Sequence, residues 1–137
     1  MRSRVAICLG TALVAASIAA VAGAATPVPV KKITVRPFGA VLATAKRQAL
    51  YYWNVEKRDF KVHCTGACAK AWPPLLVRSA AAVPKKISGI KGRFGTIRRP
   101  DGKLQVTWNR LQIYTYAHEK AGQVLCDNVN GWFVVRV

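Results

Sequence analysis

The sequence has few of the residues that most catalytic sites use. It holds five acidic residues, and its two histidines are His63 and His118. No serine lies in the context of a nucleophile elbow, and neither a Cys-x-x-Cys pair nor a Cys-x-x-Cys-His haem-attachment motif occurs. These absences argue against a serine hydrolase, thioredoxin-type redox catalysis and haem attachment. We therefore expect a protein that is not an enzyme and uses no cofactor.

The scarcity of acids leaves the chain strongly basic. Its 22 lysines and arginines give a formal net charge of +17, which attracts polyanions. No run of five or six basic residues occurs, and no motif of a nucleic-acid-binding fold accompanies them. We expect a solvated basic surface that meets anionic cell-envelope polymers or lipid headgroups, without specific nucleic-acid recognition. The basic pairs are Lys31-Lys32, Lys46-Arg47, Lys57-Arg58, Lys85-Lys86 and Arg98-Arg99.

The N-terminal segment has the features of an export signal. A short basic head at 1–4 precedes an alanine-rich apolar run at 5–21, and a small-x-small cleavage pattern ends at Ala24. The run is also marginally long enough for a transmembrane anchor, but the cleavage pattern favours removal. Because Cys8 lies near the start of the run, we expect no lipid anchor. We predict that 1–24 is a signal peptide and that the protein is periplasmic or secreted.

The rest of the chain consists of short β-type runs broken by turn residues. Asp101-Gly102 separates two alternating runs, which is a hairpin signal, and no stretch shows sustained helical periodicity. We predict an all-β fold with a short cysteine-containing turn or helical turn, after a linker at 25–32, and we assign no structure to 79–90. The expected strands are 33–36, 38–42, 49–55, 60–63, 75–77, 95–98, 104–108, 111–116 and 132–137.

An aromatic motif occurs twice. The two copies are Tyr51-x-Trp53-x-x-Glu56 and Tyr114-x-Tyr116-x-x-Glu119. An aromatic-x-aromatic pattern puts both rings on one face of a strand, and the acid then falls where the strand should end. The recurrence indicates two copies of one structural unit. We predict one domain at 38–137 made of two related antiparallel β-repeats, 38–78 and 94–137, after an N-terminal segment at 25–37 that can include a first strand.

With these motifs the chain resembles the bacterial secreted repeats of unknown function, also described as predicted lipoproteins with a conserved Yx(FWY)xxD motif. The resemblance covers about 38–137, and it brings no established reaction with it. Both motif acids are glutamates here, where the family has aspartate. The other shared motifs are Cys64-Thr65-Gly66-Ala67-Cys68, Trp72-Pro73-Pro74, Asp101-Gly102 and Gln105-Val106-Thr107-Trp108.

The three cysteines beyond the signal peptide cannot all pair internally. Chain entropy favours a long bridge to Cys126, worth about 4 kcal/mol, over a Cys64–Cys68 bridge worth about 2 kcal/mol. Gly66 permits the turn that the short bridge needs. The family pattern keeps the C-x-G-x-C pair without Cys126. The resemblance therefore implies a Cys64–Cys68 disulfide, with Cys126 free and at least partly buried.

For the two motif acids, Glu56 and Glu119, two interpretations stand. They could act as paired carboxylates if the repeats face each other. We expect instead that they take salt bridges from Lys57, Arg58 or Lys120, or that they cap turns. The tyrosines and tryptophans should form core and cross-strand pairs, although an exposed aromatic row could stack on sugars or bases.

Two classes of function follow. The first is an exported, non-catalytic envelope or secreted module with a basic binding surface. The alternative is a periplasmic metal-binding or redox protein that uses His63, Cys64, Cys68 and Cys126, with His118 as a further ligand. The C-x3-C spacing matches no standard zinc pair, and an oxidising compartment would compete for the thiols. We therefore favour the first class.

Overall fold

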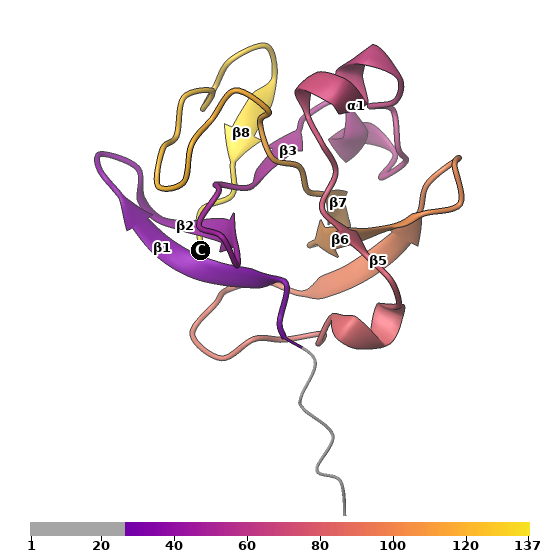
Figure 1. Ribbon diagram of the computed structural model, residues 1–137, viewed down its shortest axis with the longest axis horizontal. Coiled ribbons are helices and arrows are strands. Elements are labelled where there is room, and N and C mark those ends of the chain that lie inside the picture. The colour runs from indigo at the N-terminus through magenta and orange to yellow at the C-terminus, as the bar shows by residue number, and fades with distance from the viewer. Residues whose placement is uncertain (1–26) are drawn as a thin grey trace, which may run out of the picture.

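The computed structural model describes residues 27–137, in which short antiparallel strands are joined by loops (Figure 1). The predicted signal peptide lies outside these residues. The predicted β class, with one short helical turn near the cysteines, is confirmed. The elements are β1 (Val30–Val35), β2 (Gly39–Thr44), β3 (Tyr51–Trp53), η1 (Glu56–Arg58), α1 (Ala67–Ala71), β4 (Leu76–Val77), η2 (Ala80–Ala82), β5 (Phe94–Arg98), β6 (Leu104–Trp108), β7 (Leu111–Gln112) and β8 (Trp132–Val134).

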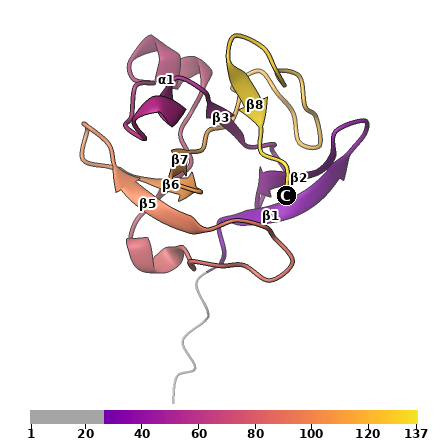
Figure 2. The same cartoon turned by 180° about the vertical axis from the view of Figure 1, so that it is seen from behind.

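Two hairpins, β1–β2 and β5–β6, have matching registers. Val30 faces Thr44 at the open end of the first hairpin, as Phe94 faces Trp108 in the second. The turn predicted in the second hairpin is present, and the Asp101 carboxylate accepts the N–H of Lys103 there at 3.0 Å. Figures 1 and 2 show the two hairpins on opposite sides of the molecule, with β3 and β7 between them.

Each half of the chain gives its last strand to the sheet of the other half. β8 pairs with β3, and β4 pairs with β6. The flanking residues repeat the exchange, because Val135 N–H donates to Leu50 O at 2.9 Å and Leu75 N–H donates to Ile113 O at 3.0 Å. The two halves are therefore interlocked.

The exchange centres on two tyrosines that face each other. Tyr51 N–H donates to Tyr114 O at 2.8 Å, and Tyr114 N–H donates to Tyr51 O at 2.9 Å. The backbone contacts on either side of this pair match one another, as expected for an approximate two-fold axis through it. We infer that the halves are two copies of one unit; the limits 38–78 and 94–137 stay a prediction.

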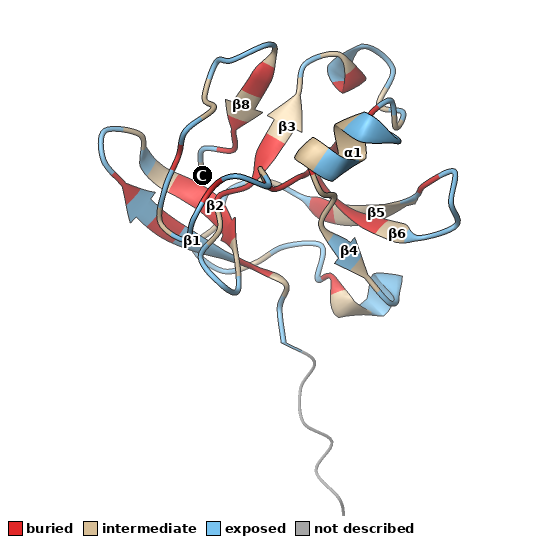
Figure 3. Ribbon diagram, turned by 45° about the horizontal axis from the view of Figure 1, so that its top comes forward, coloured by how far each residue is buried: buried red, intermediate tan, exposed pale blue. Residues whose placement is uncertain are grey.

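Two clusters of buried residues fill the interior. One contains the motif aromatics, and the other joins the hairpins through Leu42, Leu50, Phe94, Val106 and Ile113. Figure 3 shows the buried residues concentrated in the strands, whereas α1 is exposed or half-buried. No helix within 27–137 has the length and apolar character needed to span a membrane.

Several predicted boundaries were wrong. The strands predicted at 49–55, 111–116 and 132–137 are shorter in the structure, at Tyr51–Trp53, Leu111–Gln112 and Trp132–Val134. Residues 60–63 form no strand, because Phe60 has a φ of +57°, which interrupts an extended backbone. The strand β1 begins at Val30, so 30–32 belong to a hairpin and not to the linker predicted at 25–32. Val30 is buried against the second core cluster, and this contact extends the strand toward the N-terminus. The unassigned stretch 79–90 contains the 3-10 turn η2.

Candidate functional site

The motif tyrosines and glutamates form two crossed pairs. The hydroxyl of Tyr51 donates to Oε2 of Glu119 at 2.5 Å, and the hydroxyl of Tyr114 donates to Oε1 of Glu56 at 2.7 Å. Both tyrosines and Glu56 are fully buried, and Glu119 is 6% exposed. Each motif tyrosine therefore binds the motif acid of the other half.

The same two carboxylates hold the loops that follow them. Oε1 of Glu56 accepts the backbone N–H groups of His63 at 2.8 Å and Cys64 at 3.1 Å. Oε2 of Glu119 accepts the N–H of Leu125 at 2.9 Å. Each carboxylate thus joins a tyrosine of one half to a loop of the other.

The salt bridges expected for Glu56 and Glu119 were the wrong interpretation. Within 27–137 neither carboxylate forms an ion pair, and Lys57, Arg58 and Lys120 are exposed to solvent. The physical reason is burial, since the glutamates point inward while long basic side chains stay in water. Binding of loop N–H groups is close to the turn-capping role that we also considered.

Burial shifts the pKa of Glu119 and of both motif tyrosines. It raises the pKa of Glu119, while the hydrogen bonds from Tyr51 and from the N–H of Leu125 oppose that shift. Burial and the neighbouring carboxylates also raise the pKa of both Tyr51 and Tyr114 far above the ordinary value. Both hydroxyls therefore stay protonated and act as fixed donors, which suits a structural role.

Four aromatic rings stack in the order Trp53, Trp132, Trp72, Tyr116. The two central rings, Trp72 and Trp132, lie 3.9 Å apart between centroids and are 6° from parallel. Trp53 stacks on Trp132 at 5.4 Å, and Tyr116 lies against Trp72 at 4.7 Å. The second aromatic of each motif therefore also packs on a residue of the other half. Such pairs contribute about 0.5–1.5 kcal/mol each beyond their buried area.

The first aromatic of each motif meets this stack edge-on. Tyr51 contacts Trp72 at 5.3 Å between centroids, and Tyr114 contacts Trp132 at 5.2 Å. The central tryptophans are 9% and 4% exposed. The motif aromatics thus pack in the interior, as expected for core and cross-strand aromatics. The two central rings of the stack, Trp72 and Trp132, are buried and offer no platform for sugars or bases.

Cys64 and Cys68 form a disulfide, the pairing that the family resemblance implied. Their Cα atoms lie 5.2 Å apart, and Gly66 between them has a φ of +55°. The helix α1 begins at Ala67, so only Cys68 is helical and the bridge does not span a regular helical turn.

The disulfide-bonded segment Cys64–Cys68 leads into Trp72, which lies in the aromatic stack. The N–H of Trp72 donates to Cys68 O at 2.8 Å, which closes α1. The two prolines that follow continue as an extended segment beside the second motif. Pro73 O accepts the N–H of Thr115 at 2.9 Å, and Pro74 forms a β-bridge with Tyr114.

The four residues of the alternative metal set are not brought together as ligands. The disulfide occupies Cys64 and Cys68, and the Nε2 atom of His63 lies 2.9 Å from the Asp59 carboxylate. No three His, Cys, Asp or Glu side chains gather in a metal-binding arrangement within the described part of the chain. Cys126 is free and half-buried there, and burial raises the pKa of its thiol.

The ring of the second histidine, His118, contacts the ring of Tyr116 with centroids 5.5 Å apart. It is exposed and lies in the turn that follows Tyr116.

Arg99 is a buried charge that the basic pair Arg98-Arg99 did not reveal. It is 5% exposed, and its guanidinium donates to Oε1 of Gln105 and to Cys64 O, both at 2.7 Å. The same group lies 6.0 Å from the centre of the Tyr114 ring. The period of two in the strand could have indicated this position, because Arg99 shares a face with Ile97.

The other basic residues of 27–137 face solvent, and among them Arg136 is the one that forms an ion pair with an acid. Between 27 and 137 every lysine and arginine other than Arg99 is exposed. The acids do not balance them, because Glu56 and Glu119 are buried and Asp127 pairs with Arg136 at 2.6 Å. Asp59 is paired with a histidine. The structure therefore buries two of the five acids and leaves nearly all of the positive charge of residues 27–137 on the surface.

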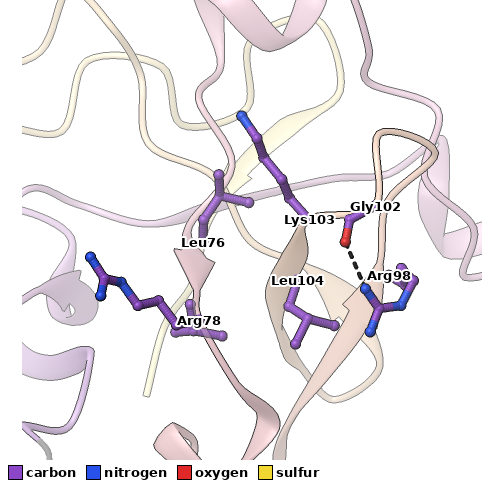
Figure 4. Close-up of a pocket in the computed structure, with 7 residues that line it drawn as sticks. Leu76, Arg78, Arg98, Gly102, Lys103 and Leu104 are labelled. Atoms are coloured by element: carbon purple, nitrogen blue, oxygen red, sulfur yellow. Dashed lines mark hydrogen bonds between the residues drawn. The ribbon is translucent and has the colours of Figure 1, made fainter.

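One basic hollow lies at the turn of the β5–β6 hairpin, beside β4 (Figure 4). Its volume is about 360 Å³, and no acidic side chain lines it. Figure 4 shows the side chains of Arg78, Arg98 and Lys103 around Leu76 and Leu104. This combination of cationic rim and apolar floor suits an anion that carries some apolar surface.

Comparison with known protein families finds a match to one segment of the chain. Residues 32–76 match the secreted repeat of unknown function. The resemblance expected from the motifs is thereby confirmed for this segment, and the family description agrees with the predicted export. No curated protein and no solved structure matches the chain. The secreted repeat is described as being of unknown function.

Proposed function

We propose that this protein is an exported, non-catalytic binding module that holds anionic polymers or lipid headgroups of the cell envelope on its basic surface. The observation that carries this proposal is the segregation of charge. Two of the five acids are buried, two more are paired, and the lysines and arginines between 27 and 137 are exposed with the exception of Arg99. A surface of this kind produces a positive potential that attracts polyanions.

The contacts in the interior support a scaffold role for the motif residues of the repeat. Their hydroxyls, carboxylates and rings are used in contacts between the halves, and the two motif tyrosines hold their protons. Exposed cations on such a frame can bind anionic polymers or lipid headgroups without catalysing a reaction.

A salt titration tests the proposal. We expect the protein with residues 1–24 removed to bind vesicles that contain phosphatidylglycerol, and to bind acidic polysaccharide, but not vesicles of phosphatidylcholine alone. Counterion release should make the affinity fall steeply as salt rises, and screening acts over about 8–10 Å near physiological salt. An affinity that stays flat from low to high salt would contradict the proposal, as would equal binding to neutral vesicles.

A further inference from the structure

Three shallow hollows run in a line along β5. The first lies between Arg93 and Arg110, with a volume of about 380 Å³. The second shares Thr107 and Arg110 with the first, has a volume of about 230 Å³, and includes Phe60. The third has a volume of about 450 Å³. These hollows together are called the β5 groove below.

The hollows adjoin one another, because neighbouring ones share lining residues. Ile97 lines both the second and the third hollow, and Lys61 and Arg98 line the third. Arg98 also lines the hollow at the hairpin turn, so the basic lining continues to Arg78. The result is an elongated basic surface made of adjoining shallow hollows.

The charge in the β5 groove is positive along its length. Its exposed cations are Lys61, Arg93, Arg98 and Arg110. The acid that lines it, Asp59, already binds the ring of His63. Guanidinium groups bind phosphate and carboxylate oxygens in a planar, two-point geometry. Oxyanions spaced along a flexible chain therefore match this lining.

The surface beside β1, which corresponds to the β5 groove, is packed more deeply. The loop held by Glu119 places Val124 in the core, 9% exposed, in the same cluster as Ile33 and Val35. The loop held by Glu56 instead leaves Val62 half-buried at the wall of the third hollow. Val62 thus lies at the wall of a hollow, whereas its counterpart Val124 is buried, although both halves share the same strand pairing.

The groove lacks the aromatic surface that stacks nucleic-acid bases. The Arg110 guanidinium covers the ring of Phe60 at 4.0 Å, and Phe94 is buried. Proteins that bind single-stranded nucleic acid combine cations with open aromatic rings. The lining therefore favours an acidic polymer without bases.

We propose that the β5 groove is the binding site for a linear acidic glycan or polyol polymer whose phosphate or carboxylate groups are held by Lys61, Arg93, Arg98 and Arg110. This site rests on the proposed function and names the part of the basic surface that carries it. The polymer lies along β5, between that strand and the segment 59–62.

A pair of charge-matched variants tests the site. The groove variant combines Lys61→Gln, Arg93→Gln and Arg98→Gln. The control variant combines Lys31→Gln, Arg36→Gln and Arg47→Gln, which removes the same charges from the β1–β2 side. All six side chains are exposed. Binding of fluorescent inorganic polyphosphate and of labelled polygalacturonate is measured by anisotropy over a range of salt.

We expect the groove variant to lose at least about tenfold in affinity and the control to lose less than about threefold. The magnitude of the slope of log affinity against log salt should be smaller by about 2 in the groove variant. The reason is that fewer counterions are released on binding when cationic contacts are lost. Equal losses in the two variants would overturn the groove and leave diffuse binding by the whole surface intact. Absence of binding by the unaltered protein would overturn the proposed function as well.

Two further measurements complete the test. Tighter binding of polyphosphate or of polygalacturonate identifies the anionic group, and either order supports the site. If oligothymidylate displaces the bound polymer at a lower concentration of negative charge than the polymer itself, the assignment to polymers without bases is wrong. Thermal unfolding checks the fold, and Lys61→Gln alone replaces the triple variant if that variant does not fold.

Discussion

The two tyrosine–glutamate pairs have the same geometry and different surroundings. Beside the Tyr114–Glu56 pair lie the buried cation of Arg99 and the amide of Gln105. The register of the first hairpin puts Val35 and Val41 at the corresponding positions near Tyr51, where the other glutamate is Glu119.

The comparison shows that hydrogen-bond geometry and electrostatic environment are set separately. The motif fixes the hydrogen bonds of both pairs, whereas residues of the hairpins decide whether a cation is near. Burial without a nearby cation raises the pKa of Glu119. The four predictions below test how far the two halves are equivalent.

The largest effect should come from the tryptophans at the centre of the stack. Trp72→Ala and Trp132→Ala should each cost about 3–5 kcal/mol in the free energy of unfolding, because both rings are buried. Since the rings touch, the double variant should cost less than the sum of the two. Urea denaturation measures these values, and strict additivity would show that the halves do not depend on one another here.

Loss of the buried cation should be the next largest effect, and it has no counterpart at the first hairpin, where Val35 occupies the matching position. Arg99→Met leaves the oxygens of Gln105 and Cys64 without their donor, at a cost of about 2–4 kcal/mol. The neighbouring Arg98→Met is the control, because that side chain is exposed and surface changes stay within about 0.5 kcal/mol. Similar costs for both variants, measured by urea denaturation, would contradict the role of Arg99.

The disulfide belongs to the first half, and its removal should have a moderate effect. Replacing Cys64 and Cys68 with Ser together should cost about 2 kcal/mol, since the closed loop is short. Cys126 follows Leu125 as Cys64 follows His63, but it has no disulfide partner in the described chain. Cys126→Ser should therefore be nearly silent in thermal denaturation, and a large loss would show that this thiol contributes to stability.

The smallest expected effect is a pH dependence from Glu119. Because its pKa is raised in the folded state, the folded protein retains a proton that the unfolded chain has already released. This contribution to stability is present below the unfolded pKa, near about 4.3, and is lost as the pH rises through the folded value. Glu119→Gln should remove that part of the dependence.

Denaturant unfolding over a series of pH values checks this prediction. Asp101→Asn removes one carboxylate from an exposed turn and serves as the control. An unchanged pH profile in Glu119→Gln would show that the surroundings of Glu119 do not set its protonation.

Much of the fold was predictable from the sequence because local patterns determine it. The Asp101-Gly102 turn and the alternation around it predicted the β5–β6 hairpin, which the structure contains. The motif repeats also predicted aromatic residues in the core. The failed strand at 60–63 reflects a positive φ at Phe60, which an aromatic residue does not signal.

The crossed pairing could not be predicted in the same way. Each copy of the motif contains one tyrosine and one glutamate. The sequence pattern is the same whether Tyr51 pairs with Glu56 of its own unit or with Glu119 of the other unit. The choice depends on the exchange of β4 and β8, a long-range contact without a local signal. The burial of Arg99 and the β5 groove likewise depend on which loop covers which hairpin.

The exchange of last strands has a topological consequence. Two separate chains, each containing one unit, could make every contact seen here between β3 and β8 and between β4 and β6 as an isologous dimer. The segment 78–93 is what makes this arrangement a single molecule. We expect two fragments cut within that segment to stay associated through their shared sheets and the tyrosine–glutamate pairs, because the covalent link mainly raises the effective concentration of the halves.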